Sequence, residues 1–115
     1  MPTDSAFPPL LSAQADIDRA CAAMADAPRI SFDTEFVRTR TYAPRLGLLQ
    51  VGVGTHCLCI DPLGTAQLED FWAQLFDGAR AIILHAGKQD MELLWFERGR
   101  VLSNLVDTQA CAALL

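Results

Sequence analysis

Residues 30–37 read ISFDTEFV, a run of β-branched and aromatic residues that contains two acids. Such a composition favours a β-strand, and we predict one over residues 29–37. Successive side chains of a strand point to opposite faces, so Asp33 and Glu35 share one face and Thr34 points the other way. An unpaired carboxylate inside a protein is costly, so this strand needs a feature that makes its two acids tolerable.

Three arrangements would make the acid pair tolerable. A hard divalent cation such as Mg²⁺ or Mn²⁺ would bind the two carboxylates, because it prefers oxygen ligands. Alternatively, the acids pair with Arg38 or Arg40, which follow closely in the chain. They could also lie at the exposed end of an edge strand. The spacing of the acids alone leaves these alternatives open.

Hydrophobic periodicity and turn residues place further elements on both sides of this strand. We expect a hairpin with its turn at Gly54-Thr55, followed by alternating helices and strands, which makes an α/β domain with a mixed sheet. The expected elements are strands over 46–53, 56–60 and 81–85, a helix over 13–26, a helix with Leu68, Phe71, Trp72, Leu75 and Phe76 on one face, a helix with Met91, Leu94 and Trp95 on its inner face, and a last helix capped by Asp107.

Composition limits the classes of protein. With 115 residues the chain is long enough for one small domain, and it contains no apolar stretch of the roughly 20 residues needed to cross a bilayer. The N-terminus lacks the pattern of a signal peptide, so we expect a cytoplasmic protein without membrane association. The net charge of −5 argues against a wide basic surface, but Arg38, Arg40 and Arg45 cluster in a stretch without acids, which suits a local anionic ligand.

The cysteines form no CxxC pair. Cys21, Cys57, Cys59 and Cys111 are expected to be buried free thiols, because reduced cysteine packs like a small hydrophobic residue. A zinc site built from His56, Cys57 and Cys59 is the alternative, although a second pair of ligands is missing from the sequence.

A second polar motif, HAGKQD, spans residues 85–90 at the end of the apolar strand and the start of a helix. Asp90 falls in the first helical turn, where the helix dipole favours an acid, so a purely structural role is one interpretation. His85, taken alone, is interpreted as a hydrogen-bonded histidine at the strand end.

The order of these motifs is more informative than any one of them. The order resembles that of the DEDD superfamily of 3′–5′ exonucleases: a strand with D-x-E, a hairpin, a helix, a strand ending in H-x-x-x-x-D and a further helix. The stretches DTEFVRTRTYAPRLGLLQVG (33–52), IDPLG (60–64) and HAGKQDMELL (85–94) resemble the ribonuclease D family in particular. This resemblance spans about residues 29–113 and implies a ribonuclease H-like fold, a mixed sheet flanked by helices.

The resemblance also implies the chemistry. Asp33 and Glu35 match the first motif of the family and Asp90 the second, which implies catalysis with Mg²⁺ or Mn²⁺ bound by these acids. The implied reaction is hydrolysis of RNA from its 3′ end to nucleoside 5′-monophosphates, with transfer RNA precursors or other structured RNA as substrates. The expected RNA-binding residues are Arg38, Arg40, Tyr42, Arg45 and His85, with a solvated basic loop as the alternative for the first four.

One part of the family pattern is missing. The third motif, Tyr-x-x-x-Asp, does not occur, and Asp107 is no substitute because no tyrosine lies four residues before it. We therefore expect residues 1–115 to be the N-terminal, C-terminally truncated portion of the exonuclease domain, without the helical RNA-binding domains. The isolated chain is expected to have little or no activity. The alternative is a catalytically incomplete nucleic-acid-binding or structural fragment of such a nuclease.

Overall fold

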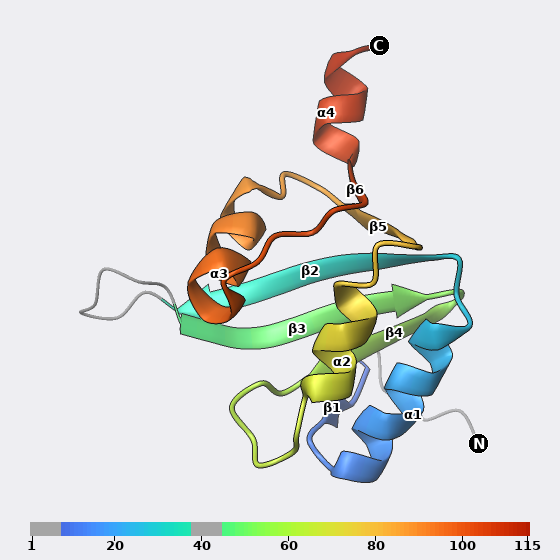
Figure 1. Cartoon of the computed structure of the whole chain (residues 1–115), viewed down its shortest axis with the longest axis vertical. Coiled ribbons are helices and arrows are strands. Elements are labelled where there is room, and N and C mark those ends of the chain that lie inside the picture. Colours follow the sequence, from blue (N-terminus) through green and yellow to red (C-terminus); the bar gives the residue numbers. More distant parts are fainter. Residues whose placement is uncertain (1–7, 38–44) are drawn as a thin grey trace.

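A computed structural model of the chain describes residues 8–37 and 45–115, and Figure 1 shows their arrangement. Helices and strands alternate along most of the chain, which confirms the predicted α/β class. The elements are β1 (Leu10–Leu11), α1 (Gln14–Ala25), β2 (Arg29–Val37), β3 (Arg45–Val53), β4 (His56–Ile60), α2 (Glu69–Leu75), β5 (Ala81–Leu84), α3 (Lys88–Arg98), β6 (Leu105–Asp107) and α4 (Thr108–Ala113).

The strands form one mixed sheet with the order β1-β4-β3-β2-β5-β6. β2, β3 and β4 are antiparallel neighbours, whereas β5 lies parallel to β2, β6 parallel to β5 and β1 parallel to β4. The predicted hairpin and mixed sheet are therefore confirmed. Because β2 lies between β3 and β5, the proposal that its acids lie on an edge strand is wrong.

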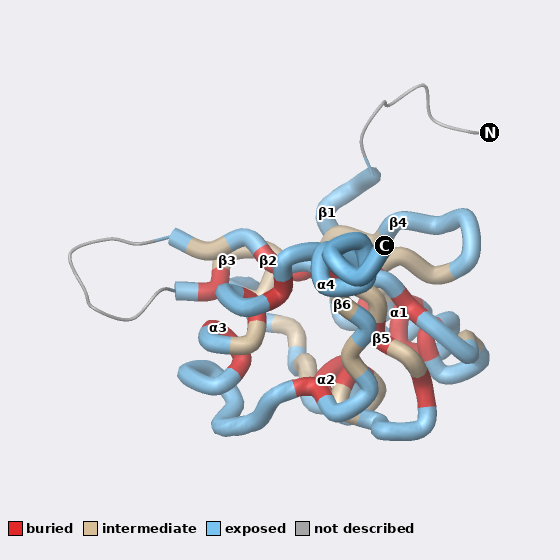
Figure 2. Tube along the Cα trace, turned by 90° about the horizontal axis from the view of Figure 1, so that it is seen from above, coloured by how far each residue is buried: buried red, intermediate tan, exposed pale blue. Residues whose placement is uncertain are grey.

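One face of the sheet carries the hydrophobic core. Figure 2 shows α1, α2 and α3 on the same side of the sheet, where their apolar side chains meet those of the strands. The largest fully buried side chains are those of Ile17, Met24, Ile30, Leu49, Val51, Ile60, Phe71, Leu75, Ile82, Leu93 and Leu94. The opposite face is not covered by a helix within the described residues, so side chains that point to it are open to solvent.

The inner face of α3 differs from the prediction. Leu94 is buried as expected, but Trp95 is 59% exposed, and Leu93 packs into the core instead. The buried residues of this helix are Asp90, Leu93 and Leu94, at the i, i+3 and i+4 spacing of one face. Because Asp90 is directed to the sheet, the helix is rotated so that Trp95 points outward.

All four cysteines are free thiols, as predicted, but the predicted burial is correct only for Cys21. Cys57 and Cys111 are exposed and Cys59 is partly exposed. For Cys57 and Cys59 the reason is that hydrophobicity alone does not distinguish the core face of β4 from its open face. Cys111 lies on α4, which has no buried residue.

The C-terminal helix α4 extends away from the body of the domain, and none of its residues is buried (Figure 1). Its cap is as predicted, because the side chain of Asp107 accepts a hydrogen bond from the backbone N–H of Gln109. None of the helices in the described ranges is long and apolar enough to cross a membrane.

Candidate active site

The two acids of β2 lie on the open face of the sheet. The strand alternates between exposed and buried residues, with Asp33 and Glu35 exposed and Thr34 buried, so the predicted distribution over the two faces is confirmed. In the neighbouring strand, Asp33 lies opposite Gln50 and Glu35 opposite Leu48. Exposure to solvent therefore removes most of the cost that burial of two carboxylates would carry.

A third acid reaches the same strand from α3. The pairing of β2 with β5 covers residues 29–31, so the backbone of Thr34 lies beyond the end of that pairing. The Thr34 N–H donates to Oδ1 of Asp33 at 3.0 Å and to Oδ1 of Asp90 at 3.1 Å. Asp33 and Asp90 therefore lie beside one another, because both carboxylates contact the same nitrogen.

Thr34 also holds Asp90 with its side chain. The Thr34 hydroxyl donates to the same Oδ1 of Asp90 at 2.5 Å. Both residues are buried, at 5% and 6% exposure. A buried polar group needs a hydrogen-bond partner, so each of these two residues satisfies the other.

The surroundings of Asp90 disfavour its charged form. Burial raises the pKa of the Asp90 carboxyl above its ordinary value, and the charge of Asp33 raises it further, whereas the hydrogen bonds from Thr34 oppose this. A cation placed next to Asp33 and Asp90 would stabilise both carboxylates, because it offsets their repulsion and the loss of hydration.

Thr34 is the residue that sequence analysis missed. The strand pattern identified it only as a side chain that faces the core. A hydroxyl at a core-facing position of a strand was nevertheless a usable signal, because a buried hydroxyl calls for a partner from another element. The identity of that partner could not be read from the sequence, since Asp90 lies 56 residues further along the chain.

The turn between β5 and α3 positions Asp90. Ala86 has a positive φ of 55°, and the carboxylate of Asp107 accepts hydrogen bonds from the N–H groups of Ala86 at 3.0 Å and Gly87 at 2.9 Å. A Cβ atom on Gly87 would lie 2.0 Å from Cδ1 of Leu84, so only glycine fits without a shift of neighbouring atoms. These backbone hydrogen bonds, that of Gly87 foremost, lower the pKa of Asp107 below its usual value.

His85 lies at the end of β5 and is exposed. Its Nδ1 lies 2.9 Å from the hydroxyl of Thr108, which in turn donates to the carbonyl of Leu84 at 3.2 Å. The Thr108 hydroxyl thus links the His85 ring to the backbone at the end of β5. This agrees with the interpretation of His85 as a hydrogen-bonded histidine at the strand end. It is not a hydrogen-bond partner of Asp33, Thr34 or Asp90.

The predicted basic residues are only partly described. Arg45 is exposed at the start of β3, opposite Val37. Arg38, Arg40 and Tyr42 lie outside the described residues, and so does the predicted pairing of the acids with Arg38 or Arg40.

The described ranges contain no group of three His, Cys, Asp or Glu side chains arranged to hold a metal ion. The zinc alternative is therefore wrong: His56 alternates with Cys57 along β4 and points to the opposite face. Asp33 and Asp90 fit a hard cation better, because they supply adjacent carboxylate oxygens, with Glu35 on the same face as Asp33.

Comparison with known proteins identifies the family. The sequence matches the 3′–5′ exonuclease family over residues 10–115. The chain belongs to the 3′–5′ exonuclease family. Exonucleases of this family generally use divalent metal ions.

Within this exonuclease family, several relatives are ribonucleases D. Ribonuclease D of Escherichia coli is 45% identical over 93 residues, covering 81% of this chain and 25% of the relative. Ribonuclease D of Psychromonas ingrahamii is 46% identical over 90 residues, covering 78% of this chain and 24% of the relative. The chain thus spans about a quarter of the length of these relatives.

Solved structures support the same assignment. The crystal structure of Escherichia coli RNase D, described as an exoribonuclease involved in structured RNA processing, matches with a TM-score of 0.84 and 39% identity over 93% of this chain and 28% of that chain. The Trypanosoma brucei RNase D in complex with RNA U12 matches with a TM-score of 0.77 over 88% of this chain and 37% of that chain. Its identity of 18% supports the fold alone. The predicted ribonuclease H-like exonuclease fold is confirmed.

Proposed function

We propose that the protein is a 3′–5′ exoribonuclease of ribonuclease D type that hydrolyses RNA from the 3′ end to nucleoside 5′-monophosphates. The observation that carries this proposal is the meeting of Asp33 and Asp90 at the Thr34 N–H, where an exposed carboxylate of the open sheet face lies beside a buried carboxylate from α3. Membership of the exonuclease family supports it. Transfer RNA precursors are the proposed substrates, in a cytoplasmic setting.

Each acid has a proposed role at this site. Asp33, Glu35 and Asp90 would hold Mg²⁺ or Mn²⁺, which when bound supplies an activated water and stabilises the leaving 3′ oxygen. Thr34 fixes the carboxylate of Asp90 through its hydroxyl and its backbone N–H. Basic side chains would balance the negative charge of the RNA phosphates. The proposed RNA contacts are Arg38, Arg40, Tyr42, Arg45 and His85.

A second candidate function is a catalytically incomplete RNA-binding fragment. The absence of a three-residue metal cluster within the described ranges favours it for residues 1–115 taken alone. Under the main proposal, these residues are the N-terminal portion of the nuclease domain, and the third motif comes from further along a longer chain.

The two candidates are separated by assaying two chain lengths on one 5′-labelled RNA with Mg²⁺ or Mn²⁺. We expect shortening from the 3′ end by a chain extended past the third motif and little or none by residues 1–115. In the extended chain, Asp33→Asn or Asp90→Asn should abolish activity, whereas Asp26→Asn, at an exposed acid at the end of α1, should not. If the unsubstituted extended chain also fails to shorten the RNA, the RNA-binding fragment is favoured.

A further inference from the structure

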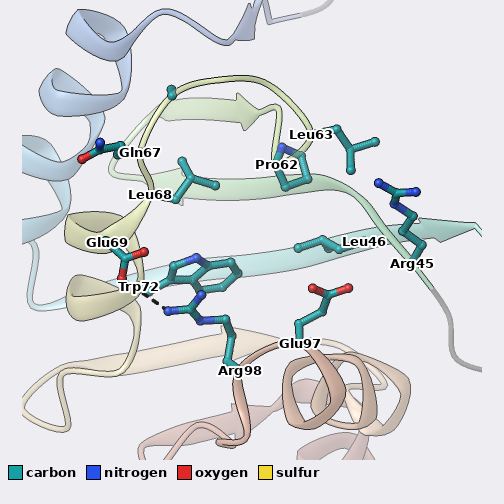
Figure 3. Close-up of a pocket in the computed structure, with 11 residues that line it drawn as sticks. Arg45, Leu46, Pro62, Leu63, Gln67, Leu68, Glu69, Trp72, Glu97 and Arg98 are labelled. Atoms are coloured by element: carbon teal, nitrogen blue, oxygen red, sulfur yellow. Dashed lines mark ion pairs between the residues drawn. The ribbon is translucent and has the colours of Figure 1, made fainter.

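A pocket of about 710 Å³ lies on the helix-covered side of the sheet, away from the face that carries Asp33 and Glu35. Its walls come from the start of β3, the loop between β4 and α2, the first half of α2 and the last turn of α3 (Figure 3). Small-molecule pockets usually span roughly 300–1,000 Å³, so this volume suits one nucleotide.

The floor of the pocket is a stack of an arginine on a tryptophan. Trp72 is buried, and Cζ of Arg98 lies 5.0 Å from the centroid of its ring. Nη2 of Arg98 also forms an ion pair with Oε2 of Glu69 at 3.5 Å, and the Arg98 side chain is 34% exposed. The guanidinium thus lies over the indole ring, and both side chains line the pocket. Nucleic-acid bases stack readily on such guanidinium planes.

Two charged side chains, Glu97 and Arg45, line the pocket beside this floor. They are suited to the hydroxyl or amino groups and to the phosphate of a nucleotide. Figure 3 shows the Glu97 carboxylate directed into the space between Arg98 and Arg45. A carboxylate there can accept hydrogen bonds from ribose hydroxyls or from exocyclic amino groups. Arg45, on the far side, supplies the guanidinium donors that pair with phosphate oxygens.

The rim of the pocket is held by hydrogen bonds. In the loop after β4, Oδ1 of Asp61 accepts from the N–H of Leu63 at 2.8 Å. Gln67 is fastened to α1 at both of its backbone groups, since its N–H donates to Oε1 of Gln14 at 2.7 Å and its carbonyl accepts from Nε2 of Gln14 at 3.1 Å. A rim fixed before binding reduces the entropy lost when a ligand binds.

We propose that this pocket binds one nucleotide unit, with its base stacked on Arg98 and its phosphate at Arg45. The proposal rests on the proposed function, because a protein that processes RNA encounters a base joined to a phosphate in two forms. One is a nucleotide within the RNA strand, and the other is a released nucleoside 5′-monophosphate. Both place a base on the guanidinium plane, and the experiment distinguishes them.

The test uses residues 1–115 with Trp95→Phe, which leaves Trp72 as the reporter of tryptophan fluorescence. Titrations with AMP and with a short single-stranded RNA are made in EDTA, so that metal-dependent binding at Asp33 and Asp90 does not contribute. We expect saturable quenching, and Arg98→Ala should weaken binding about tenfold, as expected for loss of one stacked base. RNA that binds more tightly than AMP indicates the strand as the source; the reverse indicates the free nucleotide.

Arg100 provides a matched control, because its Cζ lies 4.6 Å from the ring centroid of Phe76 and it does not line the pocket. Arg100→Ala should leave the affinity within about twofold. Arg98→Lys keeps the charge but loses the planar surface, so it should weaken binding at an unchanged unfolding midpoint.

Three results would overturn the nucleotide pocket: no saturable quenching by either probe at millimolar concentration, equal weakening by Arg98→Ala and Arg100→Ala, or loss of binding in Asp33→Asn. The proposed nuclease function fails separately, by the absence of RNA shortening in the extended chain. A chain that binds AMP but never cleaves RNA would therefore retain the pocket and lose the function.

Discussion

Replacement of Thr34 by valine tests the contact that organises the candidate site. Valine has nearly the shape of threonine, so Thr34→Val opens no cavity at this buried position. It removes one interaction, the 2.5 Å hydrogen bond from the hydroxyl to Oδ1 of Asp90, and leaves the bond from the backbone N–H in place. The effect of the substitution can therefore be assigned to a single contact.

The magnitude follows from two opposing changes in stability. A hydrogen bond to a charged group contributes about 1.5–3 kcal/mol to stability, whereas the added methyl group of valine gains about 0.8 kcal/mol by burial. Loss of the hydrogen bond therefore outweighs the gain from the methyl group. We expect Thr34→Val to lower the free energy of unfolding by about 1–2 kcal/mol under conditions where the Asp90 carboxyl is ionised.

Urea denaturation of the 115-residue chain measures this change, and Thr34→Ser is its control because it keeps the hydroxyl. In an Asp90→Asn background the acceptor is neutral, so the effect of Thr34→Val should fall by about half. Equal effects in the two backgrounds, or equal effects of the valine and serine substitutions, would refute the assignment. In the extended nuclease, Thr34→Val should lower kcat more than it raises KM, because it displaces a proposed catalytic acid and leaves the RNA contacts intact.

Three further predictions concern buried and titrating groups. The pKa of Asp90 is raised in the folded state, so its contribution to stability is complete below the unfolded-state pKa of about 3.9 and is lost as pH rises through the folded-state pKa. The stability of Asp90→Asn should therefore increase relative to that of the unsubstituted chain as pH rises. Asp107 has a lowered pKa, so it stabilises above about pH 3.9 and loses this effect as pH falls, and Asp107→Asn should show the opposite trend in the same urea series. Arg80 is buried and donates to the carbonyl of Met24 and to Oε1 of Gln74 at 2.8 Å, and its Nε has no hydrogen-bond partner among the described residues. Removal of the Arg80 guanidinium also removes a buried charge, so Arg80→Met should change the free energy of unfolding by less than about 1.5 kcal/mol. Arg80→Ala leaves a cavity and should lower it by about 2–5 kcal/mol. Similar losses in the two variants would contradict this expectation.

The sheet could be predicted well because its strands carry strong local signals. Alternation along β2 and the Gly54-Thr55 turn determine which residues pair and which face they occupy. β1 could not be predicted, because a strand of two residues exists only through its pairing with β4. The orientation of Trp95 was likewise decided by tertiary contacts, since α3 is rotated to direct Asp90 toward Thr34.

The acids of the candidate site were predicted from the sequence, but the contact between Asp33, Thr34 and Asp90 was not. The strand period placed Asp33 and Glu35 together, because both lie within one element. The contact of Asp90 with Thr34 joins two elements, and its geometry depends on the turn at Ala86 and on the Asp107 carboxylate that fixes it. Asp107 was predicted only as the cap of the following helix, since local sequence does not show that the same carboxylate also binds a distant turn.

The position of the site follows from the end of a strand pairing. β5 ends at Leu84 and the chain turns into α3, whereas β2 continues in the same direction past that point. The Thr34 N–H then lacks a strand partner on that side, and buried backbone donors must be paired, so side-chain carboxylates take the place of a carbonyl. Carboxyl ends of neighbouring parallel strands are where ligands bind in open α/β sheets. The same geometry that satisfies one backbone group therefore brings an exposed acid of β2 and a buried acid of α3 together at the end of the strand pairing.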